Sequence, residues 1–114
     1  MIATVRVSMF VHATEDETRL LDALKGLVPP DKITRTQLNG HFDNPIIDLK
    51  ATLNGDEADM LFKRICKELD IDRKEFLNRK EDNKIYLRLD KDGLLNGKLT
   101  TGGDEGIHLE FRLR

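Results

Sequence analysis

The sequence predicts an α+β two-layer sandwich, with a mostly antiparallel sheet that carries its helices on one face. Two observations lead to this fold class. Several segments alternate strictly between apolar and polar residues, as strands with one buried face do. Between them lie segments with apolar residues at helical spacing, in the order strand, helix, two strands, two helices, strand, a short piece and strand. The second face of such a sheet meets water or a partner.

The first strand is predicted over residues 2–12. Its core-facing residues are Val5, Val7, Met9 and Val11, and its outward residues are Thr4, Arg6, Ser8, Phe10 and His12. The helix that follows should begin at a capping box formed by Thr14 and Glu17. Its buried stripe consists of Leu20, Leu21, Leu24, Leu27 and Val28. Pro29-Pro30 ends this helix because proline cannot continue it.

Two strands are then predicted, at about 32–40 and 45–54, joined by a turn in the stretch "LNGHFDNPII". In the second strand Ile47, Leu49, Ala51 and Leu53 share one face. Asn54-Gly55 is a turn signal, and Asp56 should cap a helix over about 57–69. That helix has a buried stripe of Ala58, Leu61, Phe62, Ile65 and Leu69. A further short helix, in "IDRKEFLNRKED", buries Phe76 and Leu77.

The last third of the chain returns to strands. "KIYLRLDK" points Ile85, Leu87 and Leu89 inward, and "HLEFRLR" does the same with Leu109, Phe111 and Leu113. The glycine-rich segment between them is predicted to be a structured excursion with one helical turn and a short strand. It lacks the glycine spacing of a phosphate-binding loop and leads into a strand instead of a helix.

Length and composition narrow the class of protein. The 114 residues fit one domain over 1–114, and the 19 basic and 21 acidic residues nearly cancel. Cys66 is the single cysteine and lies on a helical apolar stripe, so a buried thiol is expected in place of a disulfide or a thiolate metal site. No apolar run is long enough to span a bilayer or form a signal peptide, which predicts a cytoplasmic protein without membrane contact.

The stretch "LNGHFDNPII" permits three interpretations. His41 and Asp43 could act as base and orienting carboxylate, but no nucleophile lies near them in sequence. They could also supply two metal ligands, although His12 or His108 would have to complete the site from other strands. The third interpretation is a hairpin turn, structural only or with His41 and Asn44 touching a ligand or RNA. No cofactor, metal or catalytic residue is predicted.

The outward residues of the strands form the most informative set. A solvated surface explains charged residues there, but arginine outnumbers carboxylate and two aromatic residues lie among the guanidinium groups. Residues 73–91 also carry a local charge of +3 in a chain of net charge −2. One basic region that faces a polyanion fits this asymmetry.

Three segments, "HATEDETRLLDAL", "GHFDNPI" and "YLRLDKDGLLNGKL" with "GIHLEFRLR", resemble a small archaeal family. Its members are described as predicted RNA-binding proteins or exosome-associated subunits, and their fold is similar to that of ribosomal large-subunit protein L5. The resemblance covers nearly the whole chain. It implies roles for His12, Gly40, His41, Asn44, Pro45, Arg88 and Lys91. The chain departs from the family pattern at Asp92-Gly93 and at Asp104-Glu105-Gly106, and Asp92 would weaken a phosphate contact made by its loop.

The predicted function is therefore non-enzymatic RNA binding by a cytoplasmic L5-like domain, accessory to RNA processing or degradation or related to the ribosome. The predicted phosphate contacts are Arg6, Arg88, Lys91, Arg112 and Arg114. Tyr86 and Phe10 would stack on bases, and His12, His41 and Asn44 complete the set. The alternative is a protein–protein adaptor or a homodimer that uses the open sheet face or an edge strand. A hydrolase built on His41 and Asp43 is the third hypothesis.

Overall fold

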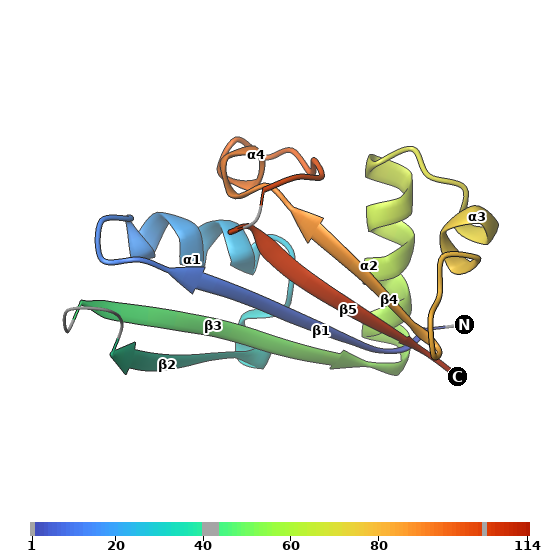
Figure 1. The fold of residues 1–114 in the computed structure, drawn as a ribbon, viewed down its shortest axis with the longest axis horizontal. Helices are drawn as coiled ribbons and strands as arrows, with labels where there is room; N and C mark the ends of the chain where they lie inside the picture. Colours follow the sequence, from blue (N-terminus) through green and yellow to red (C-terminus); the bar gives the residue numbers. More distant parts are fainter. Residues whose placement is uncertain (1, 40–43, 104) are drawn as a thin grey trace.

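The computed structural model describes residues 2–39, 44–103 and 105–114 and contains one antiparallel sheet with helices packed on one face (Figure 1). The sheet order is β2-β3-β1-β5-β4. Its strands are β1 (Ile2–Val11), β2 (Ile33–Asn39), β3 (Pro45–Asn54), β4 (Lys84–Leu89) and β5 (Ile107–Leu113). The described residues also form four α-helices, α1 (Glu17–Lys25), α2 (Gly55–Glu68), α3 (Arg73–Leu77) and α4 (Lys91–Leu95), and one 3-10 turn (Pro30–Lys32). The predicted α+β sandwich is confirmed.

Strand β1 lies at the centre of the sheet, between β3 and β5. Its core-facing residues Val5, Val7, Met9 and Val11 are all buried, as the alternation predicts. The same parity holds on β3 and β5, where Leu49 and Phe111 are fully buried. Helix α2 packs against β1 and β3 and closes this side of the sheet. On the other side of the sheet, which we call the open face, Arg6, Lys50, Tyr86 and Arg88 are exposed.

Three phenylalanines join the helical layer to the sheet. Phe62 on α2, Phe76 on α3 and Phe111 on β5 have ring centroids 5.6 to 5.7 Å apart, two of the pairs edge to face. Such pairs add about 0.5–1.5 kcal/mol to the burial of the rings themselves. Phe76 therefore anchors the short helix α3, as the sequence predicts, whereas Leu77 is only half-buried.

Both predicted helix caps are wrong. Asp16, and not Thr14, caps α1 by accepting a hydrogen bond from the Arg19 backbone N–H at 3.3 Å. Helix α2 begins directly after Asn54, so Asp56 lies inside its first turn. The Asn54 side chain makes no cap bond and instead accepts a bond from the Thr4 hydroxyl at 3.2 Å.

The excursion between β4 and β5 contains the expected helical turn, α4, capped by Asp90 at 2.9 Å from the Gly93 N–H. The short strand is only a single bridge between Leu89 and Thr101. The chain then passes so close to the end of β4 that a Cβ at Gly106 would lie 2.0 Å from the Leu89 carbonyl oxygen. Only glycine fits there without a backbone shift.

The remaining composition-based predictions concern Cys66 and the membrane. Cys66 is buried, as expected, and burial raises the pKa of its thiol. Within the described part of the chain, no helix is both long and apolar enough to cross a bilayer. The turn with Gly40, His41 and Asp43 lies outside the described residues.

Candidate nucleic-acid interface

The open face of the sheet brings together side chains from strands that are far apart in the sequence. In one row across the sheet, the register sets Arg88 beside His108, His108 beside Ser8 and Ser8 beside Lys50. In the next row, Tyr86 lies beside Glu110, which lies beside Arg6. Directly paired residues in an antiparallel sheet have Cβ atoms about 4.5–5.5 Å apart, so each row forms a continuous surface.

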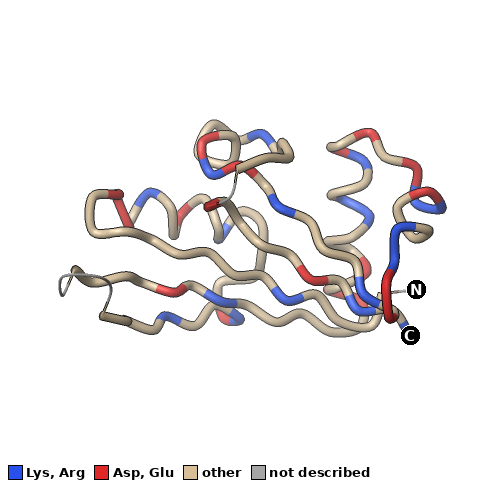
Figure 2. Tube along the Cα trace, in the orientation of Figure 1, with Lys and Arg blue, Asp and Glu red and all other residues tan. Residues whose placement is uncertain are grey.

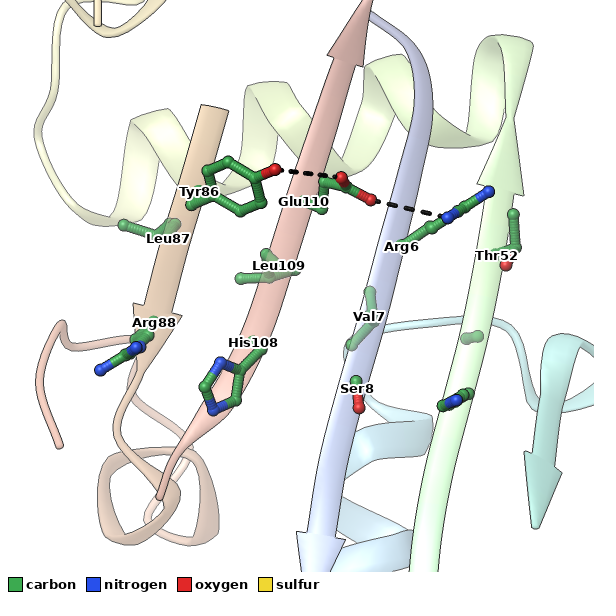
Figure 3. Close-up of a pocket in the computed structure, with 12 residues that line it drawn as sticks. Arg6, Val7, Ser8, Thr52, Tyr86, Leu87, Arg88, His108, Leu109 and Glu110 are labelled. Atoms are coloured by element: carbon green, nitrogen blue, oxygen red, sulfur yellow. Dashed lines mark hydrogen bonds and ion pairs between the residues drawn. The ribbon is translucent and has the colours of Figure 1, made fainter. Parts of the chain in front are cut away.

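These rows line a groove of about 690 Å³ that crosses β4, β5, β1 and β3 (Figure 3). We call it the open-face groove. Its polar and aromatic lining residues are Arg6, Ser8, Lys50, Thr52, Tyr86, Arg88, His108 and Glu110. The Tyr86 side chain lies at one edge and is 68% exposed. An exposed aromatic ring beside cations offers a stacking surface next to phosphate-binding charge.

Glu110 is surrounded by cations. Its carboxylate oxygens lie 3.8 Å from Arg6 Nη1, 3.7 Å from Lys84 Nζ and 3.8 Å from Arg112 Nε. The Tyr86 hydroxyl donates to Glu110 at 3.4 Å. Charge-assisted hydrogen bonds are normally about 2.7–2.9 Å, so all these contacts are loose. The Arg112 Nε atom is buried and has no hydrogen-bond partner among the described residues.

Asp48, another carboxylate on this face, is buried. It is 6% exposed, accepts a hydrogen bond from the Ser8 hydroxyl at 3.3 Å and lies 3.2 Å from Lys50 Nζ. Among the described residues, the paired strands place five cationic side chains on the open face, against two carboxylates. The five are Arg6, Lys50, Lys84, Arg88 and Arg112. Figure 2 shows the same mixture of blue and red along the strands.

The structure brings several of the predicted site residues together. Arg6, Tyr86 and Arg88 line the groove, and Arg112 lies beside it on the same face. Phe10 is on that face, opposite Asp48 and 42% exposed, but further along β1. Asn44 is exposed just before β3, and Arg114 is exposed just beyond the end of β5. His41 lies outside the described residues.

Lys91 does not lie on the open face, although the sequence suggested a phosphate contact. It is 8% exposed, and its ammonium group donates to the Phe10 carbonyl oxygen and to Glu15, at 3.0 and 3.3 Å from the two carboxylate oxygens. The reason is the turn into α4, which directs Lys91 toward the loop between β1 and α1. The basic segment 73–91 is thereby divided between the helical layer, the open face and this buried contact.

His12 also lies away from the groove. It follows the end of β1, its backbone N–H donates to Glu15 at 2.9 Å, and its Nε2 lies 3.5 Å from a Glu105 oxygen. Among the residues that the structure describes, no group of three or more histidine, cysteine or acidic side chains could hold a metal ion.

The predicted RNA-binding set leaves out four residues of this surface: Lys50, Lys84, His108 and Glu110. Their outward parity was readable, but their proximity depends on the strand order. The β4–β5 pairing sets Lys84 beside Arg112, and the β1–β5 pairing sets Glu110 beside Arg6. The two last predicted strands are joined by a glycine-rich segment, and this favours their pairing with each other. Assuming that pairing would have placed Lys84 beside Arg112 from the sequence alone.

Comparisons with known proteins identify the family of the chain. Residues 4–113 match the model of a family described as RNA binding. The chain is 30% identical to uncharacterized protein MJ0213 of Methanocaldococcus jannaschii, over 100% of this chain and 86% of that protein. It is 26% identical to RNA-binding protein PAB1135 of Pyrococcus abyssi, over 96% of this chain and 80% of that protein.

A solved structure shows the same fold. The crystal structure of protein AF2318 from Archaeoglobus fulgidus, assigned to the DUF54 family, superposes with a TM-score of 0.80. The two sequences are 28% identical, and the match covers 100% of this chain and 88% of that one.

Proposed function

Because the chain belongs to the family described as RNA binding, we propose that it binds RNA through the open-face groove and catalyses no reaction. The observation that carries this proposal is the presence of Tyr86, Arg6, Lys50 and Arg88 in one groove on the open face of the sheet. A sheet of this kind can stack unpaired bases on aromatic side chains while nearby cations bind the phosphates.

In this proposal, Arg6, Lys50, Arg88 and Arg112 contact phosphates and Tyr86 stacks on a base. Phe10 provides a second stacking surface further along β1. Asn44 and His41 contact sugar or base edges from the β2–β3 turn, and Arg114 adds charge beyond β5. His12 lies away from the groove and contacts RNA that extends past the end of β1. Lys91 is excluded because its ammonium group is already engaged inside the protein.

Four phosphate contacts predict a definite salt dependence. Single-stranded nucleic acid releases about 0.7 counterions for each phosphate that a protein neutralises, so the logarithm of the binding constant should fall with a slope of about −3 against the logarithm of salt concentration. Affinity should then drop about 50-fold between 50 and 200 mM salt. Binding that stays constant over this range would contradict the phosphate contacts.

The test is fluorescence-anisotropy binding of mixed-sequence single-stranded RNA by the wild type and by Lys50→Glu/Arg88→Glu. We expect salt-dependent binding by the wild type and a loss of at least tenfold in the variant. Lys67→Glu/Lys74→Glu, on the helical side, makes the same change in net charge and should bind as the wild type does. Equal losses in both variants would show that only the total charge matters.

We further propose that residues 1–114 act as one domain whose fold is related to that of ribosomal large-subunit protein L5. The protein would work in the cytoplasm, as an accessory to RNA processing by the exosome or at the ribosome. Co-purification of the chain with exosome subunits or ribosomal particles, and its loss after nuclease treatment, tests this role.

A second candidate function, a protein–protein adaptor or homodimer, is favoured by one observation. Leu38 on β2 and Phe10 on β1 are each 42% exposed, near the edge strand β2. Sedimentation at low and high salt distinguishes this function from RNA binding. A stable dimer that covers the open face at both salt concentrations, and that Leu38→Asp dissociates, would support the adaptor.

A further inference from the structure

Glu110 lies at the centre of a surface that we propose binds a polyanion, and this position is unexpected. A carboxylate there repels phosphate and occupies cations that could bind it. If the only task of the groove were to attract phosphates, an uncharged residue would serve better. Glu110 could instead serve as a hydrogen-bond acceptor for an RNA base.

We infer that the groove binds single-stranded RNA with a preference for guanine, and that Glu110 reads the guanine base. This inference rests on the proposed RNA-binding function and deepens it. It makes Glu110 a specificity-determining residue, whereas the surrounding arginines and lysines contribute affinity for any sequence.

The placement of Glu110 beside Tyr86 supports this reading. The two residues are directly paired across β4 and β5, and the Tyr86 hydroxyl points at the Glu110 carboxylate (Figure 3). A base that stacks on the exposed Tyr86 ring extends over the neighbouring strand, because the rings lie parallel and paired side chains are only about 5 Å apart. A base stacked with its hydrogen-bonding edge toward β5 places that edge over Glu110.

Glu110 also retains capacity for such bonds. An ionised carboxylate has about four acceptor positions and donates none. The contacts at Glu110 are 3.4 to 3.8 Å long, so shorter bonds to a ligand can replace or join them. Asp48 cannot do the same, because its side chain is 8% exposed against 19% for Glu110 and is held by Ser8 and Lys50.

Guanine is the base whose edge fits a carboxylate. Its N1–H and N2 amino group are adjacent donors that bind both oxygens of a carboxylate side by side. Adenine and cytosine each offer one amino donor next to a ring acceptor, and uracil offers one imino donor between two carbonyl oxygens. Guanine therefore makes two hydrogen bonds to the carboxylate and places no acceptor against it. We expect guanine to bind about tenfold or more tightly than the other bases for this reason.

The experiment compares uridine octamers with one central guanosine, inosine, adenosine or cytidine, at 50 mM salt. We expect the guanosine octamer to bind about tenfold more tightly than the others. Inosine, which lacks the N2 amino group, should return the affinity to the uridine level; this arm changes only the RNA and does not depend on a variant. Glu110→Gln should abolish the preference, and Glu75→Gln, on α3, should keep it.

Three outcomes would overturn the inference in different ways. Equal binding of all wild-type octamers would refute base reading and leave RNA binding intact. A Glu110→Gln variant that binds all octamers more tightly and still prefers guanosine would make Glu110 an electrostatic competitor only. No binding of any octamer by the wild type would overturn the proposed function itself, and this inference with it.

Discussion

Two clusters of charge in this molecule contrast in how tightly they are held. In the Lys91 cluster, the Lys91 ammonium group contacts Glu15 at 3.0 Å and the Phe10 carbonyl, and the lysine is almost fully buried. In the Glu110 cluster, Arg6, Lys84 and Arg112 surround one carboxylate at 3.7 to 3.8 Å on an open face. The first cluster has short contacts around a buried lysine, and the second has long contacts and a groove above it.

The difference separates charges that hold the fold from charges that remain available to a ligand. A buried ion that loses its partner is costly, whereas an exposed ion pair contributes only a few tenths of a kcal/mol. Changes in the Lys91 cluster should therefore act on stability, and changes on the open face on binding.

The largest expected effect is on stability, in Lys91→Met. This variant removes the ammonium donor of the Phe10 carbonyl and leaves Glu15 with only the His12 N–H, and we expect a loss of about 2–4 kcal/mol in the free energy of unfolding. The control variant Arg6→Met, whose side chain on the open face is 56% exposed and lies 3.8 Å from its carboxylate partner, should change it by less than about 0.5 kcal/mol. Urea denaturation of both variants measures the two values, and similar losses would remove the distinction between the clusters.

Tyr86→Ala should have the next largest effect, on binding. Stacking of a base on an aromatic ring contributes about 1–3 kcal/mol, so RNA affinity should fall by a factor between about 5 and 150. Tyr86→Phe keeps the ring and should keep most of the affinity. If the phenylalanine variant binds as weakly as the alanine variant, the hydroxyl and not the ring is what matters.

Single-charge changes in the groove should have smaller effects on affinity but a clear effect on salt dependence. Arg88→Ala should reduce the salt slope by about 0.7 and lower the affinity several-fold at low salt. Lys67→Ala, on α2, provides the control and should leave the slope unchanged. A slope that is the same in all three proteins would show that Arg88 makes no phosphate contact.

The smallest expected effect is the pH dependence of the Lys91 cluster. Burial, the largest influence, acts to raise the pKa of Glu15, but the His12 N–H and the Lys91 ammonium group together outweigh it and lower that pKa. Because the pKa is lower in the folded than in the unfolded protein, this contribution to stability is present above the ordinary value of 4.5 and is lost as the pH falls below it.

The measurement is thermal unfolding of the wild type and of Glu15→Gln between about pH 6 and pH 3. The difference between their melting temperatures should shrink as the pH falls, because the wild type loses the ionised carboxylate that the variant lacks throughout. A difference that is constant over this range would contradict an ionic role for Glu15.

Much of the fold could be predicted from the sequence, because strand alternation is a local property. The parity of Val5, Val7 and Met9 follows from residue order alone and is the same in the structure. The helix caps could not be predicted in this way. Thr14, Asp16 and Asp56 are all residue types that cap helices, so residue type alone does not say where α1 and α2 begin.

The candidate site could be predicted only in part, for the same reason. Arg6, Tyr86 and Arg88 were found by parity, since each alternates with a buried neighbour. Lys91 follows Arg88 in the same basic segment, but the chain turns into α4 between them, and this turn reverses its role. Glu110 was missed because its importance depends on neighbours from β4 and β1.

The width of the open-face groove limits how much RNA it can hold. It crosses four neighbouring strands, and strands lie about 4.8 Å apart, so it is about 14 Å across. Sheet surfaces of this kind stack two or three bases. A longer RNA therefore offers more binding positions, but each copy of the protein binds any one position with the same affinity. Strong attachment to a long RNA would require a second binding module nearby, which turns the next contact into an intramolecular one.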